Sequence, residues 1–479
     1  MNNSNKQLSQ VNNKVSVLID RADTYFERKS LVQATYLYQE ALALEPENIH
    51  ALNGVGVIAM QAGMLTIAVE MFDAACDIEP DNICVNKNLA LVYTRLSRYD
   101  EAIIHYLSIL DVDGNNHDVY GELARLNMRV NHLDYALHFY KYAFELHPED
   151  SRNFDGIVKL DVNSVSEDNI NTIEELLNKG NLSLQNRCNF YFSLGHLYHA
   201  RKKCDQAFAN IMVANLSKRA VFDKVKHTEF ITKIIKTFTP NLFEIFLNDD
   251  ANVENKSVFI VGMPCSGQSM IEKMLVELTD NFSIGTSNII NEIVDRLDFS
   301  SFKDKNCSEY NEEYISGVIQ NNARYFINYV NNMATKQGIN TSPLIINNLP
   351  NNFLHLGLIS LMFPNAKIIH CKRNRRDVTL SCYFENFQKE NYFSYDISTI
   401  TSYYDQYERL MDHWDSVLSN RIITIDYDDL IESPKNAAQN IINKLGVKGN
   451  HQKILEFSIE AEQTFVFNSH HYKKHFNTL

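Results

Sequence analysis

The sequence has 479 residues, of which 22% are charged and 45% hydrophobic, so a soluble protein of two or three globular domains is expected. The formal net charge of −14 argues against a nucleic-acid-binding protein, which needs an extended basic face. The eight cysteines form no C-x-x-C motif, and neither a secretory signal nor a long apolar run occurs, so we expect a cytoplasmic protein without a membrane span.

A 34-residue repeat occupies the N-terminal part of the chain. Similar turns recur at this interval, and three interior positions keep the same register, namely a small residue, an alanine and an aromatic residue. A period of 34 is typical of tetratricopeptide repeats (TPRs), each made of two antiparallel helices. The positions are Pro46, Pro80, Gly114 and Pro148 in the turns, then Ala22, Gly56, Ala90 and Ala124, then Ala34, Ala68, Ala102 and Ala136, then Tyr38, Phe72, Tyr106 and Tyr140.

The register predicts four repeats over 15–150, after a polar N-terminal tail at 1–14. A degenerate helical pair and a further repeat are expected over 151–221, and a helical bridge over 222–250. The resulting solenoid predicts a groove that binds a peptide or protein. A rigid spacer or an oligomerisation surface is the alternative interpretation.

The remaining residues, 251–479, are predicted to form an α/β domain. Short apolar runs alternate there with helical patterns, which indicates a central parallel sheet with ligands at the carboxyl ends of its strands. The predicted strands are 258–261, 344–346, 366–370 and 422–425.

A turn of small residues follows the first of these strands. Gly262, Gly267 and Ser269 match the phosphate-loop pattern G-x-x-x-x-G-K-[ST], but Gln268 stands where the lysine belongs. Free backbone N–H groups in such a turn and at the start of the next helix form a site for phosphate or sulfate. Without the lysine, ordinary ATP hydrolysis is not expected. A structural turn without a ligand is the alternative.

Cationic residues gather just beyond the strand 366–370. Lys372, Arg373, Arg375 and Arg376 lie there in an otherwise acidic protein. Arginine grips phosphate with two parallel hydrogen bonds. Because cations at a helix N-terminus oppose the helix dipole, we interpret the group as an anion site. A surface ion pair is the alternative.

Together the two motifs resemble the sulfotransferase family, and more closely its bacterial branch with N-terminal TPRs, which is related to protein-tyrosine sulfotransferases. The resemblance implies a P-loop-like fold and 3′-phosphoadenosine 5′-phosphosulfate (PAPS) as sulfuryl donor. It further implies a hydroxyl of a peptide, protein or other large acceptor as the target. Segments similar in order and spacing are 259–264, 352–359, 369–371 with 376–377, 380–384, 407–411 with 413–414, and 427 with 429–430.

The resemblance carries site residues over by position. It places the 3′-phosphate at Arg373 and Ser381, and it expects Arg376 to support the loop. The usual catalytic arginine, glutamate and lysine are replaced by Cys265, Ser287 and Asn348, so catalytic residues stay unassigned. The loop residues expected to hold the 5′-phosphosulfate are Gly262, Pro264, Cys265, Ser266, Gly267, Gln268 and Ser269.

These replacements leave two functions open. One is a PAPS-dependent transferase whose acceptor is presented by the TPR groove. The other is a catalytically inactive relative that binds 3′-phosphoadenosine 5′-phosphate and serves as a TPR scaffold. Cys265 is interpreted as an inert small residue or a reactive thiol. We predict no metal, because no carboxylate or Cys completes a ligand set with His470, His471 and His475.

Overall fold

The computed structural model describes residues 2–246, 257–279, 281–297, 311–336, 344–387, 391–418, 421–447, 449–456, 467, 469–472 and 475. The chain divides into two compact units, Met1–Ser193 and Leu194–Leu479. The division falls inside one helix, α11 (Leu184–Ala200). Within the described ranges, none of the helices combines the length and the apolar character needed to cross a membrane.

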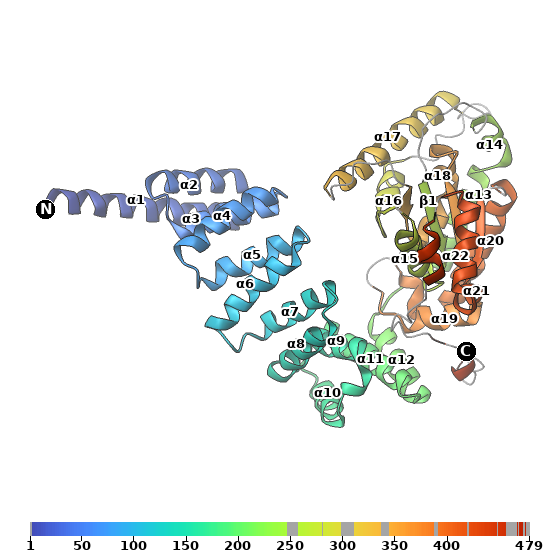
Figure 1. The fold of residues 1–479 in the computed structure, drawn as a ribbon, viewed down its shortest axis with the longest axis horizontal. Coiled ribbons are helices and arrows are strands. Elements are labelled where there is room, and N and C mark those ends of the chain that lie inside the picture. The colour runs from blue at the N-terminus through green and yellow to red at the C-terminus, as the bar shows by residue number, and fades with distance from the viewer. Residues whose placement is uncertain are drawn as a thin grey trace. The chain divides into compact units, whose positions relative to one another are not determined.

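The first unit is a series of antiparallel helix pairs (Figure 1), which confirms the predicted solenoid. Each predicted repeat corresponds to one pair, and α1 includes most of the predicted polar tail. A less regular pair, α9 and α10, occupies the region predicted to be degenerate. The helices are α1 (Asn2–Glu27), α2 (Leu31–Leu44), α3 (Ile49–Gln61), α4 (Leu65–Ile78), α5 (Ile83–Arg95), α6 (Tyr99–Val112), α7 (His117–Arg129), α8 (Leu133–Leu146), α9 (Ser151–Leu160) and α10 (Glu167–Lys179).

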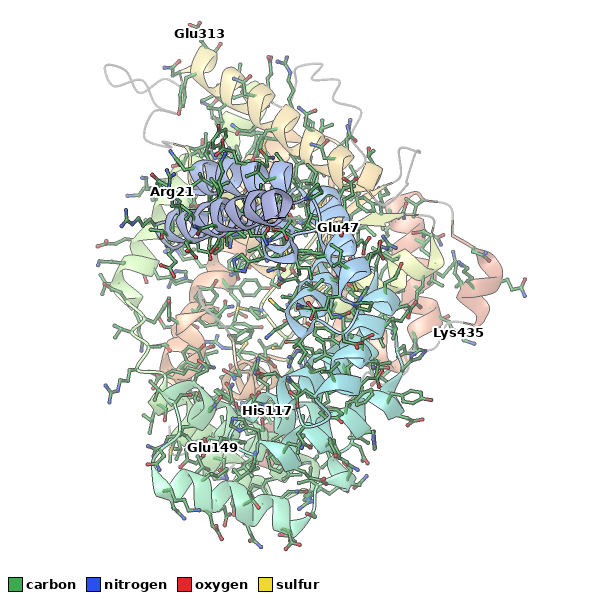
Figure 2. The ribbon with its side chains drawn as sticks, turned by 90° about the vertical axis from the view of Figure 1, so that its left-hand side faces the viewer. Arg21, Glu47, His117, Glu149, Glu313 and Lys435 are labelled. Atoms are coloured by element: carbon green, nitrogen blue, oxygen red, sulfur yellow. The ribbon has the colours of Figure 1, made fainter. Side chains whose placement is uncertain are left out.

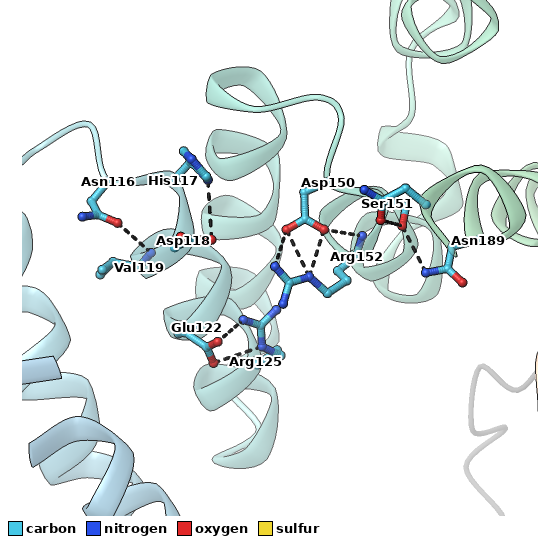
Figure 3. Close-up of polar contacts among 11 residues, drawn as sticks. Asn116, His117, Asp118, Val119, Glu122, Arg125, Asp150, Ser151, Arg152 and Asn189 are labelled. Atoms are coloured by element: carbon cyan, nitrogen blue, oxygen red, sulfur yellow. Dashed lines mark hydrogen bonds and ion pairs between the residues drawn. The ribbon is translucent and has the colours of Figure 1, made fainter. Parts of the chain in front are cut away.

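Polar side chains at 34-residue intervals start the first helix of successive pairs. The side chains of Asn48, Asn82 and Asn116 each accept a hydrogen bond from a backbone N–H in the first turn, and Asp150 does the same for α9. Figure 3 shows the Asn116 cap. Each cap satisfies an N–H that the helix leaves unpaired, which contributes about 1 kcal/mol.

The turns between the two helices of a pair share a left-handed residue that the sequence does not mark. Lys29, Gly63, Ser97 and Asn131 all have φ between 59° and 77°, again 34 residues apart. Lys202, between α11 and α12, has φ 58°. Only one of the five is glycine, so packing of the pair imposes this conformation. The turns between successive pairs contain Glu47 and Glu149, labelled in Figure 2.

Small residues of the repeat allow close approach of the helices. Ala34, Ala68, Ala102 and Ala136 have no exposed surface. A Cβ atom added to Gly56 would lie 2.5 Å from the Phe72 ring, closer than any real contact. The alternation of small and aromatic residues therefore forms a continuous core along the stack.

The second unit begins with helices that pack on the α/β fold. Phe238, at the end of α13 (Lys224–Thr237), meets α18 so closely that a Cβ on Gly357 would lie 2.4 Å from its ring. The His413 ring hydrogen-bonds the Phe238 carbonyl at 2.8 Å. The helices predicted as a bridge thus belong to the core of this unit, while residues 247–250 of that bridge lie outside the described residues. The other two helices are α12 (Cys204–Ser217) and α14 (Pro240–Phe246).

A five-stranded parallel sheet with the order β2-β3-β1-β4-β5 forms the centre of the second unit, as the alternating pattern predicts. The two-residue strand β2 was not predicted, because so short a run shows no periodicity. The strands are β1 (Ser257–Gly262), β2 (Phe282–Ser283), β3 (Ile345–Asn347), β4 (Lys367–Lys372) and β5 (Ile422–Asp426). The helices are α15 (Gln268–Leu278), α16 (Ile289–Val294), α17 (Glu312–Lys336), α18 (Leu356–Met362), α19 (Arg375–Phe384), α20 (Ile397–Val417), α21 (Tyr427–Glu432), α22 (Pro434–Leu445) and α23 (His451–Glu456).

Helices cover both faces of this sheet (Figure 1). Val258 and Ile260 of β1 pack in one cluster with residues of α15 and α22. Between them, Phe259 points the other way, toward the rings of Phe326 and Phe363. Burial of β1 on both faces explains its unbroken apolar sequence and fixes the position of the loop at its carboxyl end.

Candidate functional site

The loop after β1 is shaped by two glycines with left-handed backbone. Gly262 has φ 154°, and a Cβ there would lie 2.6 Å from the Cys371 carbonyl oxygen. Gly267 has φ 97°, and a Cβ there would lie 2.5 Å from the Tyr427 ring. No other residue fits either position without displacement of the neighbour. The loop is therefore held between β4 and the start of α21.

Gln268 closes the loop from inside. Its side-chain amide donates to the Met263 carbonyl at 2.6 Å, and its side-chain oxygen accepts from the Ser266 backbone N–H at 3.3 Å. Both Gln268 and Ser266 are buried. The residue that replaces the phosphate-loop lysine thus brings no charge, and its oxygen meets an N–H of the kind that binds anions in such loops.

Arg373 brings a buried guanidinium against the same loop. Its Nη1 donates to the Cys265 carbonyl at 3.0 Å and to Ser381 Oγ at 3.3 Å, and its Nη2 donates to the Phe467 carbonyl at 3.1 Å. Arg373 is 8% exposed, and its Nε is buried with no hydrogen-bond partner among the residues that the structure describes. The structure therefore brings the predicted loop together with Arg373 and Ser381, although the loop lies more than 100 residues before them in the sequence.

Tyr427 joins the loop to Arg373. The guanidinium carbon of Arg373 lies 4.6 Å from the centre of the Tyr427 ring, and the same ring packs on Gly267. Burial raises the pKa of the Tyr427 hydroxyl. The sequence analysis assigned Tyr427 no role, because a lone tyrosine after a strand gives no signal of a ligand site.

The other cations of the predicted group have different surroundings from Arg373. Arg375 forms ion pairs with Asp405 and Glu408, the second at 3.1 Å, and stacks on Tyr404. Lys372 and Arg376 are exposed. The prediction of one clustered anion site is thus wrong for Arg375, whose position matches the surface ion pair kept as the alternative. Only Arg373 contacts the loop residues described here.

One of the replaced catalytic positions, Asn348, contacts a carboxylate that the sequence analysis did not single out. Glu272, on α15, accepts a hydrogen bond from Asn348 Nδ2 at 2.7 Å and another from Ser283 Oγ. Asn348 is itself tied to the sheet edge, because its backbone N–H donates to the Gly285 carbonyl at 2.8 Å. Ser287 hydrogen-bonds the Tyr329 hydroxyl at 3.1 Å.

Glu272 therefore lies where β2 and β3 end beside the loop of β1. Parallel α/β sheets bind their ligands at this edge. The sequence carried no signal for it, because a glutamate one turn into an amphipathic helix reads as an ordinary surface residue. Ser269, predicted to contact an anion, is exposed at the start of α15.

Side chains near the C-terminus, among them that of His475, contact residues of α11 and α12. The His475 ring hydrogen-bonds Asp205 at 2.9 Å and stacks on Phe208, while Tyr472 hydrogen-bonds His199 at 2.7 Å. Among the described residues, no group of three or more His, Cys, Asp or Glu side chains is able to hold a metal.

The first unit carries a polar network across α7, α9 and α11 (Figure 3). Arg125 donates to Glu122 at 3.1 Å, and Arg152 donates to Asp150 at 2.7 Å. Asn189 donates to Ser151 at 3.1 Å. These contacts satisfy polar groups of α7 and of the start of α9, and they connect α9 to α11.

Comparison with known proteins agrees with the α/β architecture. Residues 257–451 match the sequence model described as Sulfotransferase family. This stretch of the second unit is therefore similar to the sulfotransferase family, and it includes the loop, Arg373, Tyr427 and Glu272.

One curated relative is similar in sequence to part of the chain. An uncharacterized protein of Aquifex aeolicus (strain VF5) is 29% identical over 294 residues, which cover 60% of this chain and 38% of that protein. The chain thus matches well under half of the length of this relative.

Solved structures with helical repeats also match. A structure from the study of PilF of Pseudomonas aeruginosa has 15% identity and a TM-score of 0.35, and covers 42% of this chain and 90% of its own. The crystal structure of MamA has 15% identity and a TM-score of 0.29, and covers 41% of this chain and 94% of its own. These scores are low, so the repeats are assigned here from their period and helix pairing.

Proposed function

We propose that the second unit binds PAPS and transfers its sulfuryl group to a hydroxyl of a peptide, protein or other large acceptor held by the TPR solenoid. The observation that carries this proposal is the 3.0 Å hydrogen bond from Arg373 to the Cys265 carbonyl, which sets a buried cation against a glycine-shaped loop. A donor with phosphates at both ends needs such a pair of sites, one for each anionic group.

The residues present fit an anionic nucleotide. The unpaired Nε of Arg373 is a buried donor, and an N–H left in this state costs free energy until an acceptor reaches it. The side-chain oxygen of Gln268 accepts from Ser266 N–H, a contact that a phosphate or sulfate oxygen can replace when the amide rotates. Ser381 supplies a hydroxyl beside the guanidinium. The bound donor supplies the activated sulfuryl group.

In this proposal Glu272 accepts the proton of the acceptor hydroxyl. Ser283 and Asn348 each occupy one site on its carboxylate and orient it, and each oxygen keeps a second acceptor site for a hydroxyl. Cys265 in the loop and Asn348 after β3 stand where the resemblance expects an arginine and a lysine, so neither position supplies a cation to the transferred group. Charge stabilisation then falls to the loop N–H groups and the N-terminus of α15.

Calorimetry with 3′-phosphoadenosine 5′-phosphate tests the binding half of the proposal, and transfer of radiolabelled sulfate from PAPS to a tyrosine-peptide library tests the chemical half. We expect both to be positive. Binding without transfer to any acceptor would favour the alternative, an inactive sulfotransferase-like scaffold whose solenoid binds a protein partner. Absence of binding at high micromolar ligand would remove both.

A further inference from the structure

Two cysteine side chains meet under the anion loop. Cys382, on α19, is fully buried, and its thiol donates to the Pro264 carbonyl at 3.4 Å. Its side chain also lies close to that of Cys265, the next residue along the loop, which helps to raise the pKa of Cys382. Neither is in a disulfide, and Cys265 is partly exposed. One thiol therefore reaches solvent through the loop while its neighbour is enclosed.

The surroundings give the two thiols different roles. The contact with Cys265 and burial raise the pKa of Cys382, whereas the Arg373 guanidinium acts in the opposite direction. Cys265 has a left-handed backbone with φ 65°, and its carbonyl is fixed by Arg373. A partly exposed thiol near a permanent cation, with a second thiol in contact, is the arrangement in which a first oxidation is captured by a neighbour.

We propose that Cys265 and Cys382 are an oxidisable pair that forms a reversible disulfide in the anion loop when the protein meets a peroxide. The Cys265 sulfur attacks one peroxide oxygen, the O–O bond breaks, and Cys265 becomes a sulfenic acid while hydroxide leaves and takes a proton to form water. The Cys382 sulfur then attacks the Cys265 sulfur. The S–S bond forms, the S–O bond breaks, and the departing hydroxide leaves with the Cys382 proton as water. Peroxide gains two electrons, one from each sulfur.

The disulfide ties the loop covalently to α19. Pro264 and Cys265 lie between the two glycines that shape the loop, so the bond fixes the segment whose N–H groups face Gln268. We expect the backbone of the oxidised loop to be unable to move when an anion replaces the contact between Gln268 and the Ser266 N–H. This consequence rests on the proposed nucleotide site, but the formation of the disulfide does not.

Peroxide treatment of the full chain, followed by alkylation and peptide mass spectrometry, tests the pair directly. We expect a peptide cross-linked through Cys265 and Cys382, loss of two of the eight thiols, and full recovery with dithiothreitol. The Cys265→Ser variant lacks one of the two thiols and should not form the cross-link. Because Cys265 is partly exposed, the change leaves the buried core intact. Cys84→Ser, at an exposed cysteine of the first unit, is the matched control and should form the cross-link normally.

The outcomes separate this inference from the proposed function. If peroxide converts Cys265 to sulfinic acid without the cross-link, or if the cross-link is absent under conditions that oxidise Cys84, the inference is overturned. If the cross-link forms and abolishes thermal stabilisation by 3′-phosphoadenosine 5′-phosphate, both the disulfide and its effect on the loop are supported. If the cross-link forms but the reduced protein is not stabilised either, the disulfide stands and the proposed nucleotide site fails.

Discussion

The two units of this protein differ in the range of their contacts along the sequence. In the solenoid, each helix pair packs on its neighbours, and the same cap, small residue and aromatic residue return every 34 residues. In the α/β unit, the candidate site joins Cys265 to Arg373 across 108 residues and Arg373 to Phe467 across a further 94. Damage to a repeat should therefore stay local, whereas damage to the site should remove a function without a large loss of stability.

The largest expected effect falls on the chemistry of the second unit. Glu272→Gln keeps a side chain of the same shape between Ser283 and Asn348 but cannot accept a proton. We expect the rate of sulfuryl transfer to fall by about 10²- to 10⁴-fold with nucleotide binding unchanged. Radiolabel transfer and calorimetry measure the two quantities. Glu277→Gln, at an exposed glutamate of the same helix, is the control, and equal rates in both variants would contradict the role of Glu272.

A core substitution in the solenoid tests whether its stability is local. Phe72 is fully buried against Gly56, so Phe72→Ala should lower the free energy of unfolding of the first unit by about 3–5 kcal/mol. Scanning calorimetry should show one transition moving to lower temperature and the other unchanged. Tyr36→Ala, at a 60% exposed position, serves as control. A joint shift of both transitions would show that the units unfold together.

Loss of the buried guanidinium should weaken nucleotide binding. Arg373→Ala removes the charge beside the loop, and a charge-assisted hydrogen bond of about 1.5–3 kcal/mol corresponds to an affinity lower by roughly 10- to 100-fold. The measurement is the thermal shift with 3′-phosphoadenosine 5′-phosphate, relative to each variant without ligand. Arg375→Ala, which removes the ion pairs with Asp405 and Glu408 and the stacking on Tyr404 but no contact with the loop, should bind normally. An unchanged shift in Arg373→Ala would remove Arg373 from the proposed site.

Acid should destabilise the second unit through His370. Burial, and to a smaller extent Lys372, lowers the pKa of this ring from 6.5 to about 4. As the pH falls, the unfolded chain therefore binds a proton at His370 before the folded chain does. The contribution of the neutral His370 ring to the free energy of unfolding is complete above about pH 6.5 and is lost as the pH falls toward 4. His370→Gln should remove about 3 kcal/mol of this dependence between pH 7 and pH 4. Denaturant unfolding from pH 4 to 7 measures it, and parallel curves for both proteins would contradict the assignment.

The smallest effect concerns a helix cap in the solenoid. Asn82→Ala leaves the Val85 N–H without its side-chain acceptor at 3.1 Å and should cost about 1 kcal/mol. Asn82→Ser keeps a capping oxygen and should recover most of this loss. Urea unfolding of the first unit compares the three proteins. Equal stability of the alanine and serine variants would show that the cap contributes nothing here.

Interactions that are local or periodic could be predicted from the sequence. The 34-residue period predicted the helix pairs, and alternating apolar segments predicted the parallel sheet. The glycine turn was placed correctly at the end of β1. These features depend on residues close in sequence, whose spacing records which face is buried. The ligands assigned to the loop and to Arg373 stay predictions.

Tertiary structure decided the features that depend on distant residues. Four cations lie together in the sequence, but Arg373 bonds to the loop, whereas Arg375 forms ion pairs with Asp405 and Glu408 of α20. The sequence likewise did not predict the positions of Glu272 and Tyr427 or the contact between Cys265 and Cys382, because the sheet brings these residues to their neighbours. Side-chain direction at the end of a strand is set by which neighbours the sheet order supplies, and spacing along the chain does not encode that order.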